Sequence, residues 1–150
     1  MNMMLLGKYI MGKKFKVLNI DHVAFATKDI EKTKKIFSDI LGMQSKDIEY
    51  IEHEKVDVLK LFTNGSNTVL ELFQPRDDNV KINNFITKNG NGLHHIALEV
   101  DNLKNLIQYL NDIDIPLVCQ KPKIGSDNKL ITFIHPKYST GMLIELCQKQ

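Results

Sequence analysis

The chain has 150 residues, of which 43% are hydrophobic and 25% charged, a composition typical of a globular protein with a well-packed core. Its 20 basic and 18 acidic residues are interspersed, which leaves a net charge of +2 and no strongly basic stretch. This charge pattern argues against nucleic acid or an anionic membrane as a partner.

Residues 1–16 are predicted to be an N-terminal extension. Their apolar part, Met3 to Leu6, is interrupted by Gly7 and Lys8, and no small-residue cleavage site follows. It is therefore too short for a signal peptide or a membrane-spanning helix. Met11 is an alternative start of the protein. Because no targeting segment is recognised, we expect a cytoplasmic location.

The first half of the chain is predicted to form a strand, a helix and further strands. A buried strand is expected at Ile20 to Phe25, and Asp29 is the expected N-cap of the helix that follows. The apolar face of this helix consists of Ile30, Ile36, Phe37, Ile40 and Leu41. A β-like run from Val56 to Phe62 leads through a turn at 64–67 to a strand at Leu70 to Gln74.

The second half repeats this order. After a helical segment at 79–88 and a glycine-rich exit at 89–92, a strand is expected at Leu93 to Leu98, and Asn102 is the expected cap of the next helix. The apolar face of that helix consists of Leu103, Leu106, Ile107, Leu110 and Ile113. The last two predicted strands, Leu130 to Ile134 and Ile144 to Gln148, are connected through 136–141.

An internal repeat therefore organises a single α+β domain over 17–150. The repeat consists of two βαβββ modules in pseudo-twofold relation, at about 17–76 and about 92–148. A linker helix at about 79–90 joins the two modules.

The repeat also places the same two residue types at matching positions. His22 precedes Glu71 by 49 residues, and His95 precedes Glu145 by 50 residues. A single histidine in an apolar strand is more often a hydrogen-bonded core residue than a ligand. Two buried carboxylates that recur with two histidines, however, need a shared partner, because an unpaired buried charge is costly. The pattern predicts a metal site formed by His22, Glu71, His95 and Glu145.

Imidazole and carboxylate ligands suit divalent Zn, Ni, Co, Mn or Fe. Four protein ligands that leave positions open for water favour an octahedral ion such as Co, Ni or Mn over structural zinc. The expected cofactor is therefore a divalent Co, Ni, Mn or Zn ion.

The other histidines and the cysteines are assigned to structure. His94 should point away from His95 across its strand and is expected to pack or to form a hydrogen bond outside the site. His53 is expected to be solvated, and His135 to be structural or to face the substrate. Cys119 and Cys147 are far apart, so two reduced, partly buried thiols are expected.

At this point the sequence resembles the vicinal oxygen chelate superfamily, over roughly residues 18–148. The segments that carry the resemblance are IDHVAFAT (20–27), GLHHIALEVDNL (92–103), PKIG (122–125) and FIHPKYSTGMLIELCQ (133–148). Within that superfamily, the last segment most resembles the methylmalonyl-CoA epimerases. The resemblance implies a curved mixed β-sheet around a metal-binding cleft, with His22, Glu71, His95 and Glu145 as the ligands, and a homodimer.

The resemblance also implies a reaction, the interconversion of the (R) and (S) forms of methylmalonyl-CoA. The implied route abstracts the proton between the thioester and the carboxylate and passes through a metal-stabilised enolate. Inversion needs a proton acceptor and a proton donor on opposite faces of the substrate. Glu145 is the first candidate, and Asp57 lies nearest the second carboxylate of relatives. The expected partner is thus a small acyl-CoA.

Two alternatives remain open. A glyoxalase I-type lactoylglutathione lyase would use a similar site, but its relatives tend to have an arginine shortly after the first histidine. Here the only arginine in the chain is Arg76. A non-catalytic protein that sequesters a ligand is the second alternative, although such relatives often lose metal ligands.

Overall fold

The structure is a computed structural model that describes residues 13–139 and 141–150. The interpretation of 1–12, including the start at Met11, lies outside the described residues. The chain forms two compact units, which we call the central unit (Asp21–Ile96) and the flanking unit (the residues up to Ile20 together with Ala97–Gln150). The boundaries between the two units fall within two strands, β1 (Val17–Ala26) and β6 (Gly92–Val100).

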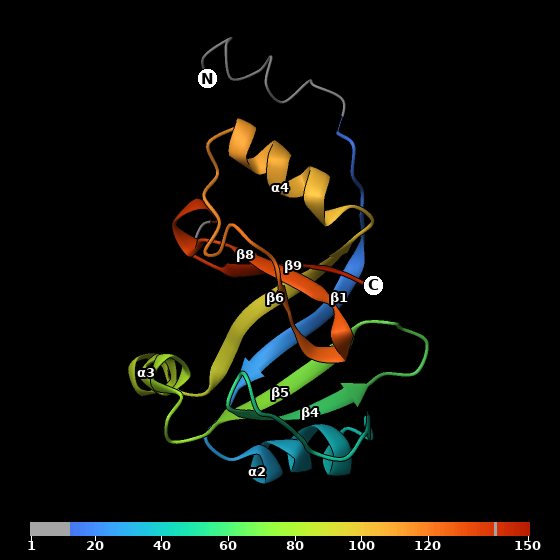
Figure 1. Cartoon of the computed structure of the whole chain (residues 1–150). Coiled ribbons are helices and arrows are strands. Elements are labelled where there is room, and N and C mark those ends of the chain that lie inside the picture. The colour runs from blue at the N-terminus through green and yellow to red at the C-terminus, as the bar shows by residue number, and fades with distance from the viewer. Residues whose placement is uncertain (1–12, 140) are drawn as a thin grey trace. The chain divides into compact units, whose positions relative to one another are not determined.

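The central unit has a mixed sheet (Figure 1). Its elements after β1 are α2 (Ile30–Lys34), a π-helical turn (Lys35–Ile40), β2 (Gln44–Ser45), β3 (Glu49–Ile51), β4 (Val56–Phe62), β5 (Val69–Pro75) and α3 (Val80–Asn89). The strand order is β2-β4-β5-β1, and β3 also pairs with β4. Strand β5 runs parallel to β1 and antiparallel to β4, so the α+β class predicted from the sequence is confirmed in this unit.

Each face of the central sheet has its own apolar cluster, because successive strand residues point to opposite sides. One cluster packs side chains of β1, β4 and β5 with α3: Ala24, Ala26, Val56, Val58, Phe73 and Ile86. The other packs the opposite sides of β4 and β5 with α2: Ile30, Leu59, Leu61 and Leu72. These two clusters define an α3 face and an α2 face of the sheet.

The flanking unit repeats the order strand, helix and three strands. It contains α4 (Leu103–Asp112), β7 (Lys123–Ile124), β8 (Leu130–Ile134) and β9 (Leu143–Gln148), with short 3-10 turns at Ser126–Asn128 and Pro136–Tyr138. Strand β8 is antiparallel to both β7 and β9. The buried side of α4 packs on one side of these strands, in a cluster formed by Val100, Leu103, Leu106, Leu110, Ile113, Leu117 and Leu146.

Helices α2 and α4 begin in the same way. Asp29 and Asn102 cap α2 and α4 through their side chains, as predicted. In addition, the Gln74 side-chain oxygen accepts a hydrogen bond from the first backbone N–H of α2, at 2.8 Å. Gln148 does the same for α4, at 2.6 Å. Because the first N–H groups of a helix have no partner within the helix, each glutamine ties a helix start to the strand that ends its module.

The tight turn between β7 and β8 contains no glycine at its tip. Asp127 and Asn128 both adopt the left-handed conformation, with φ of 54° and 56°. Asp and Asn enter this region more readily than most residues. Gly125, just before them, is held for a different reason, since a Cβ atom there would lie 2.7 Å from the Ile131 side chain.

The predicted strands and helices are present, but Ile36, Ile40 and Leu41 of the predicted apolar face of the first helix are exposed. The runs Val56–Phe62 and Leu130–Ile134 are strands with the predicted bounds, and the helix expected at 79–88 is α3. Cys147 is buried, but Cys119 is exposed, so the prediction of partial burial is wrong for Cys119, which lies in the irregular segment before β7.

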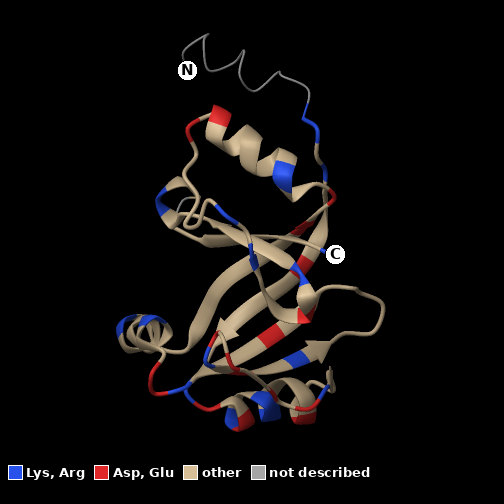
Figure 2. Cartoon of the chain, viewed as in Figure 1, with Lys and Arg blue, Asp and Glu red and all other residues tan. Residues whose placement is uncertain are grey.

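The surface charge is mixed in sign. Within the described ranges, Lys and Arg alternate with Asp and Glu, for example along α2 (Figure 2). None of the described helices has the length and apolar character that spanning a membrane requires.

Candidate metal centre

His22 lies on the α3 face of β1. It is 6% exposed and points to the same side as Ala24 and Ala26, as the alternation of burial along the strand shows. Its Nδ1 atom lies 2.9 Å from Oδ2 of Asp21. Since an ionised carboxylate only accepts hydrogen bonds, the ring donates from Nδ1. In a neutral His22 ring, the lone pair that can bind a cation is then on Nε2.

His95 meets His22 in the central unit. The Nε2 atoms of the two rings are 3.2 Å apart. Two imidazoles bound to one ion at about 2.1 Å and roughly right angles would hold their nitrogens about 3.0 Å apart, and at tetrahedral angles about 3.4 Å apart. Burial, with a smaller contribution from His22 and His94, holds the pKa of His95 well below the usual value of 6.5. A neutral ring keeps a lone pair, so this pair has the chemistry of two metal ligands.

His94 also belongs to this group, contrary to the sequence prediction. Its Nδ1 atom lies 2.8 Å from Nδ1 of His95, so the expected hydrogen bond outside the site is wrong. The other expected role, packing, is confirmed, because the ring makes edge contacts with Phe73 and Phe85, with centroids 5.3 and 4.8 Å away. Burial lowers the pKa of His94, which favours a neutral ring.

Glu71 shares the α3 face with His22. In the parallel pair of β1 and β5, Val69 is opposite His22 and Glu71 is opposite Ala24. Glu71 therefore lies on the same face as His22, two residues beyond the residue directly opposite it. Its side chain is buried, at 8% exposure. Lys60 of β4 is directly opposite Glu71 on the same face. Sequence reasoning missed Lys60, although counting in steps of two from Val56 would have placed it there.

Glu145 is in the flanking unit. It lies in β9 opposite Phe133, on the side of the strand that also carries Cys147, and it is 6% exposed. Within this unit the structure therefore places a buried carboxylate at the position that the repeat predicts.

Asp57 does not share a face with His22 and Glu71. It is paired with Gln74 across the strands and points to the α2 face. Its Oδ1 atom accepts a hydrogen bond from the Arg76 guanidinium at 2.6 Å. The physical reason is strand alternation, because Asp57 is an odd number of residues from Lys60 and Val58, which lie on the α3 face.

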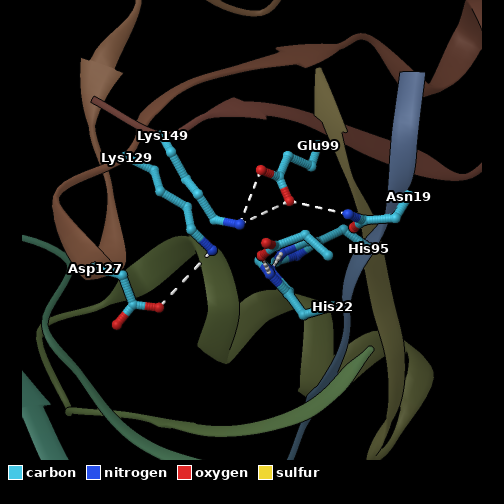
Figure 3. Close-up of polar contacts among 8 residues, drawn as sticks. Asn19, His22, His95, Glu99, Asp127, Lys129 and Lys149 are labelled. Atoms are coloured by element: carbon cyan, nitrogen blue, oxygen red, sulfur yellow. Dashed lines mark hydrogen bonds and ion pairs between the residues drawn. The ribbon is translucent and has the colours of Figure 1, made fainter. Parts of the chain in front are cut away.

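A second buried acid, Glu99, was not singled out from the sequence. It lies in the flanking unit, and Figure 3 shows its carboxylate between Asn19 and Lys149. Asn19 donates to Oε2 at 3.0 Å, and the Lys149 ammonium lies 2.9 Å from Oε1. Glu99 is thus held by a cation and an amide, whereas Lys129 of the same figure pairs with Asp127 at 3.8 Å.

The remaining histidines have structural surroundings. His53 is 56% exposed and lies 3.9 Å from Glu54, as expected for a solvated side chain. His135 caps the turn at Pro136–Tyr138, since its Nδ1 accepts a hydrogen bond from the Lys137 N–H at 3.2 Å. Of the two roles expected for His135, the structure supports the structural one.

Comparison with known proteins identifies the family. The chain is 33% identical over 147 residues to the mitochondrial methylmalonyl-CoA epimerase of Dictyostelium discoideum, which covers 97% of this chain and 83% of the relative. The methylmalonyl-CoA epimerase of Mycobacterium tuberculosis has a solved structure that matches with a TM-score of 0.84 at 28% identity, covering 96% of this chain and 95% of that one. A solved methylmalonyl-CoA epimerase in complex with methylmalonyl-CoA and NH4+ matches with a TM-score of 0.79 at 28% identity, over 89% and 96% of the two chains. Residues 21–133 match the profile of the Glyoxalase/Bleomycin resistance protein/Dioxygenase superfamily, and the chain belongs to this superfamily.

Proposed function

We propose that this protein is a methylmalonyl-CoA epimerase, which interconverts the (R) and (S) forms of its acyl-CoA substrate. The observation that carries the proposal is the likeness, over most of the chain, to relatives with this activity, one of which was solved with methylmalonyl-CoA bound. The facing imidazoles of His22 and His95, of which His95 is kept neutral by burial, give this likeness a chemical basis.

The donor set fits a divalent cation. His22 and His95 offer two nitrogens at a separation that one ion can bridge, and both are largely withdrawn from water. Glu71 lies on the same strand face as His22, and Glu145 is the buried carboxylate that the repeat pairs with His95. We propose that these four residues hold the ion and that it is Co, Ni, Mn or Zn, the divalent metals that accept mixed imidazole and carboxylate ligands.

When bound, such an ion supplies a positive charge that lowers the cost of negative charge developing on the substrate's thioester oxygen. The chain's own part is the movement of the proton. We assign to the Glu145 carboxylate the proton at C2 of the substrate, because a buried carboxylate is a stronger base than one in water. Asp57 is not assigned as its partner, because its carboxylate is on the α2 face and bonded to Arg76.

The experiment is proton–deuterium exchange at C2 of methylmalonyl-CoA in D2O, followed by NMR, with cobalt-loaded protein. The wild type should exchange the proton, and Glu145→Gln should lower the rate by about 100-fold or more, the usual contribution of a general base. Glu49→Gln is the matched control, since Glu49 is an exposed strand carboxylate outside the site. It should exchange at the wild-type rate.

No exchange above buffer by the cobalt-loaded wild type would refute the epimerase proposal. Methylglyoxal–thiol adducts would then test the lactoylglutathione lyase alternative. Purified protein that takes up no divalent metal but retains an apolar ligand would instead favour the sequestering protein.

A further inference from the structure

Two lysines of the flanking unit, Lys129 and Lys149, lie at one end of the strand face that carries Glu145. In the antiparallel pair of β8 and β9, Ile131 is opposite Cys147, and both point to this face, away from α4. The backbone of Lys129 is extended, so the same register places Lys129 opposite Lys149, one row beyond Cys147. Figure 3 shows the two lysine side chains running in the same direction. The face of Glu145 therefore ends in a pair of cations.

Carboxylates hold these cations in place. Two like charges at directly opposite positions repel each other, so their pairing needs anions nearby. The Lys149 side chain is 65% exposed, and its ammonium lies 2.9 and 3.1 Å from the two carboxylate oxygens of the buried Glu99. The Lys129 side chain is only 12% exposed, and its ammonium lies 3.8 Å from the exposed Asp127. This last contact is at the long end of the ion-pair range and is screened by water, so a bound anion can replace it.

The first module has apolar residues where the second has these charges. The repeat matches positions by their distance from the histidine and the glutamate of each module. The residues that match Glu99, Lys129 and Lys149 are, in this order, Ala26, Val56 and Pro75. Ala26 and Val56 are buried in the apolar cluster on the α3 face of the central sheet. Since buried ionic groups seldom stabilise a fold more than apolar packing does, we infer that the charges of the second module serve binding.

The substrate of the proposed function carries an anion that simple acyl-CoA thioesters lack. In methylmalonyl-CoA, C2 bears a carboxylate next to the thioester, and the proton at C2 is the one assigned to Glu145. Charge-assisted hydrogen bonds from ammonium groups to carboxylates are about twice as strong as neutral ones. The carboxylate is one bond from C2, so a cation that recognises it has to approach from a face that Glu145 shares. Lys129 and Lys149 lie on that face of the flanking unit.

We propose that Lys129, together with Lys149, binds the carboxylate of the acyl group and so selects malonyl-type thioesters over simple acyl-CoA. Glu99 is a positioning residue, because it holds the Lys149 ammonium. The inference rests on the proposed function for the identity of the substrate. The phosphates of coenzyme A are a second source of negative charge, but the largely buried ammonium of Lys129 suits a small group with a single charge better than a bulky pyrophosphate.

The test compares malonyl-CoA with propionyl-CoA, which share the coenzyme A part and differ by a carboxylate in place of a methyl group. Calorimetry on the cobalt-loaded protein gives the two dissociation constants. The wild type should bind malonyl-CoA more tightly than propionyl-CoA. Lys129→Met should weaken malonyl-CoA binding about 10-fold or more, the usual contribution of a hydrogen bond to a charged group, and should leave propionyl-CoA within about twofold.

Two further variants control for charge and for folding. Lys129→Arg should retain the preference for malonyl-CoA, because it keeps the positive charge. Lys104→Met should bind both ligands as the wild type does, since Lys104 is an exposed residue of α4, which packs on the other side of these strands. If Lys129→Met does not fold, as judged by circular dichroism, Lys129→Gln takes its place with the same expectation.

Three outcomes would overturn the proposal. Equal weakening of both ligands in Lys129→Met would assign the lysine to the phosphates of coenzyme A or to structure. Unchanged binding of both ligands in the folded variant would show that Lys129 contacts neither. A wild type without any preference for malonyl-CoA would show that the carboxylate is not recognised.

This inference and the proposed function fail separately. A wild type that prefers malonyl-CoA but exchanges no proton at C2 of methylmalonyl-CoA contradicts the epimerase and leaves the recognition of the carboxylate in place. A wild type that exchanges this proton, with a Lys129→Met variant that keeps the full preference, contradicts the role of Lys129 and leaves the epimerase in place.

Discussion

A shift of one residue along β4 decides which side chains reach the α3 face of the central sheet. Asp57 lies between Val56 and Val58, whose side chains belong to the α3 face, and so it points the other way. Lys60 is an even number of residues from Val56 and Val58, so it points to the α3 face, where it lies opposite Glu71. The charge that β4 brings to the face of His22 is therefore a cation, whereas the sequence comparison had suggested a carboxylate.

The substitution Asp57→Asn tests this assignment. The exchange rate at C2 should stay within about twofold of the wild type, because Asp57 is on the α2 face. The variant should be less stable by at most about 1 kcal/mol, since its partner Arg76 is more than half exposed and such ion pairs contribute little. A loss of exchange comparable to that of Glu145→Gln, in a folded protein, would restore Asp57 to the catalytic machinery.

At the scale of elements, both modules contain the same hydrogen bond between a strand and a helix, in addition to the repeated histidine and glutamate. In each module the glutamine three residues after the predicted ligand glutamate accepts a hydrogen bond from the first N–H of the module's helix. Gln74 and Gln148 thus couple the strand that carries Glu71 or Glu145 to α2 or α4. These two hydrogen bonds fix the position of each strand, and so of its glutamate, relative to the first residue of the helix.

Removal of either glutamine side chain should reduce stability. Gln74→Ala and Gln148→Ala each leave a part-buried helix N–H without its partner, and the cost should be about 1–2 kcal/mol. Urea unfolding followed by circular dichroism measures the change. Gln44→Ala is the control, because Gln44 is exposed in the two-residue strand β2. Equal stability of all three variants and the wild type would show that these bonds contribute nothing.

The sequence predicts most elements because their signals are long. The runs Val56–Phe62 and Leu130–Ile134 have the predicted bounds, since each is an apolar run closed by turn residues. The two- or three-residue strands β2, β3 and β7 are too short to show a period.

For the site, the same reasoning predicts which strand carries each residue but not every contact. Alternation predicts that His94 and His95 diverge, yet their ring nitrogens meet, because an imidazole is long enough to turn back toward its neighbour. The Asp21 contact with His22 escapes prediction for the same reason. Asp57 was chosen by comparison with relatives, although counting along the strand would have placed it on the other face.

At the scale of the whole molecule, we predict a homodimer. An exposed apolar segment at the start of β1 supports this prediction. The first half of β1, in the flanking unit, exposes Val17 and Leu18 by 53% each and Ile20 by 44%. Adjacent strand residues point to opposite sides, so the segment is apolar on both sides. Exposed apolar side chains that are contiguous mark sites of association more often than scattered ones do.

The dimer is tested by light scattering after gel filtration at micromolar concentration. The wild type should have the mass of two chains, and the double variant Val17→Lys with Leu18→Lys should shift toward one chain, because two charges would have to be buried. Val80→Lys is the control, since Val80 is also exposed, by 64%, but begins helix α3. A wild type with the mass of one chain contradicts the prediction directly.

The order of the two units along the chain has a consequence for how the protein is made. The central unit is one continuous stretch, Asp21–Ile96, whereas the flanking unit needs residues from both sides of it. Since chains fold from the N-terminus as they leave the ribosome, His22, Glu71 and His95 are synthesised before β8 and β9 exist. Of the four proposed ligands, a nascent chain would therefore complete two imidazoles and one carboxylate before Glu145 is synthesised.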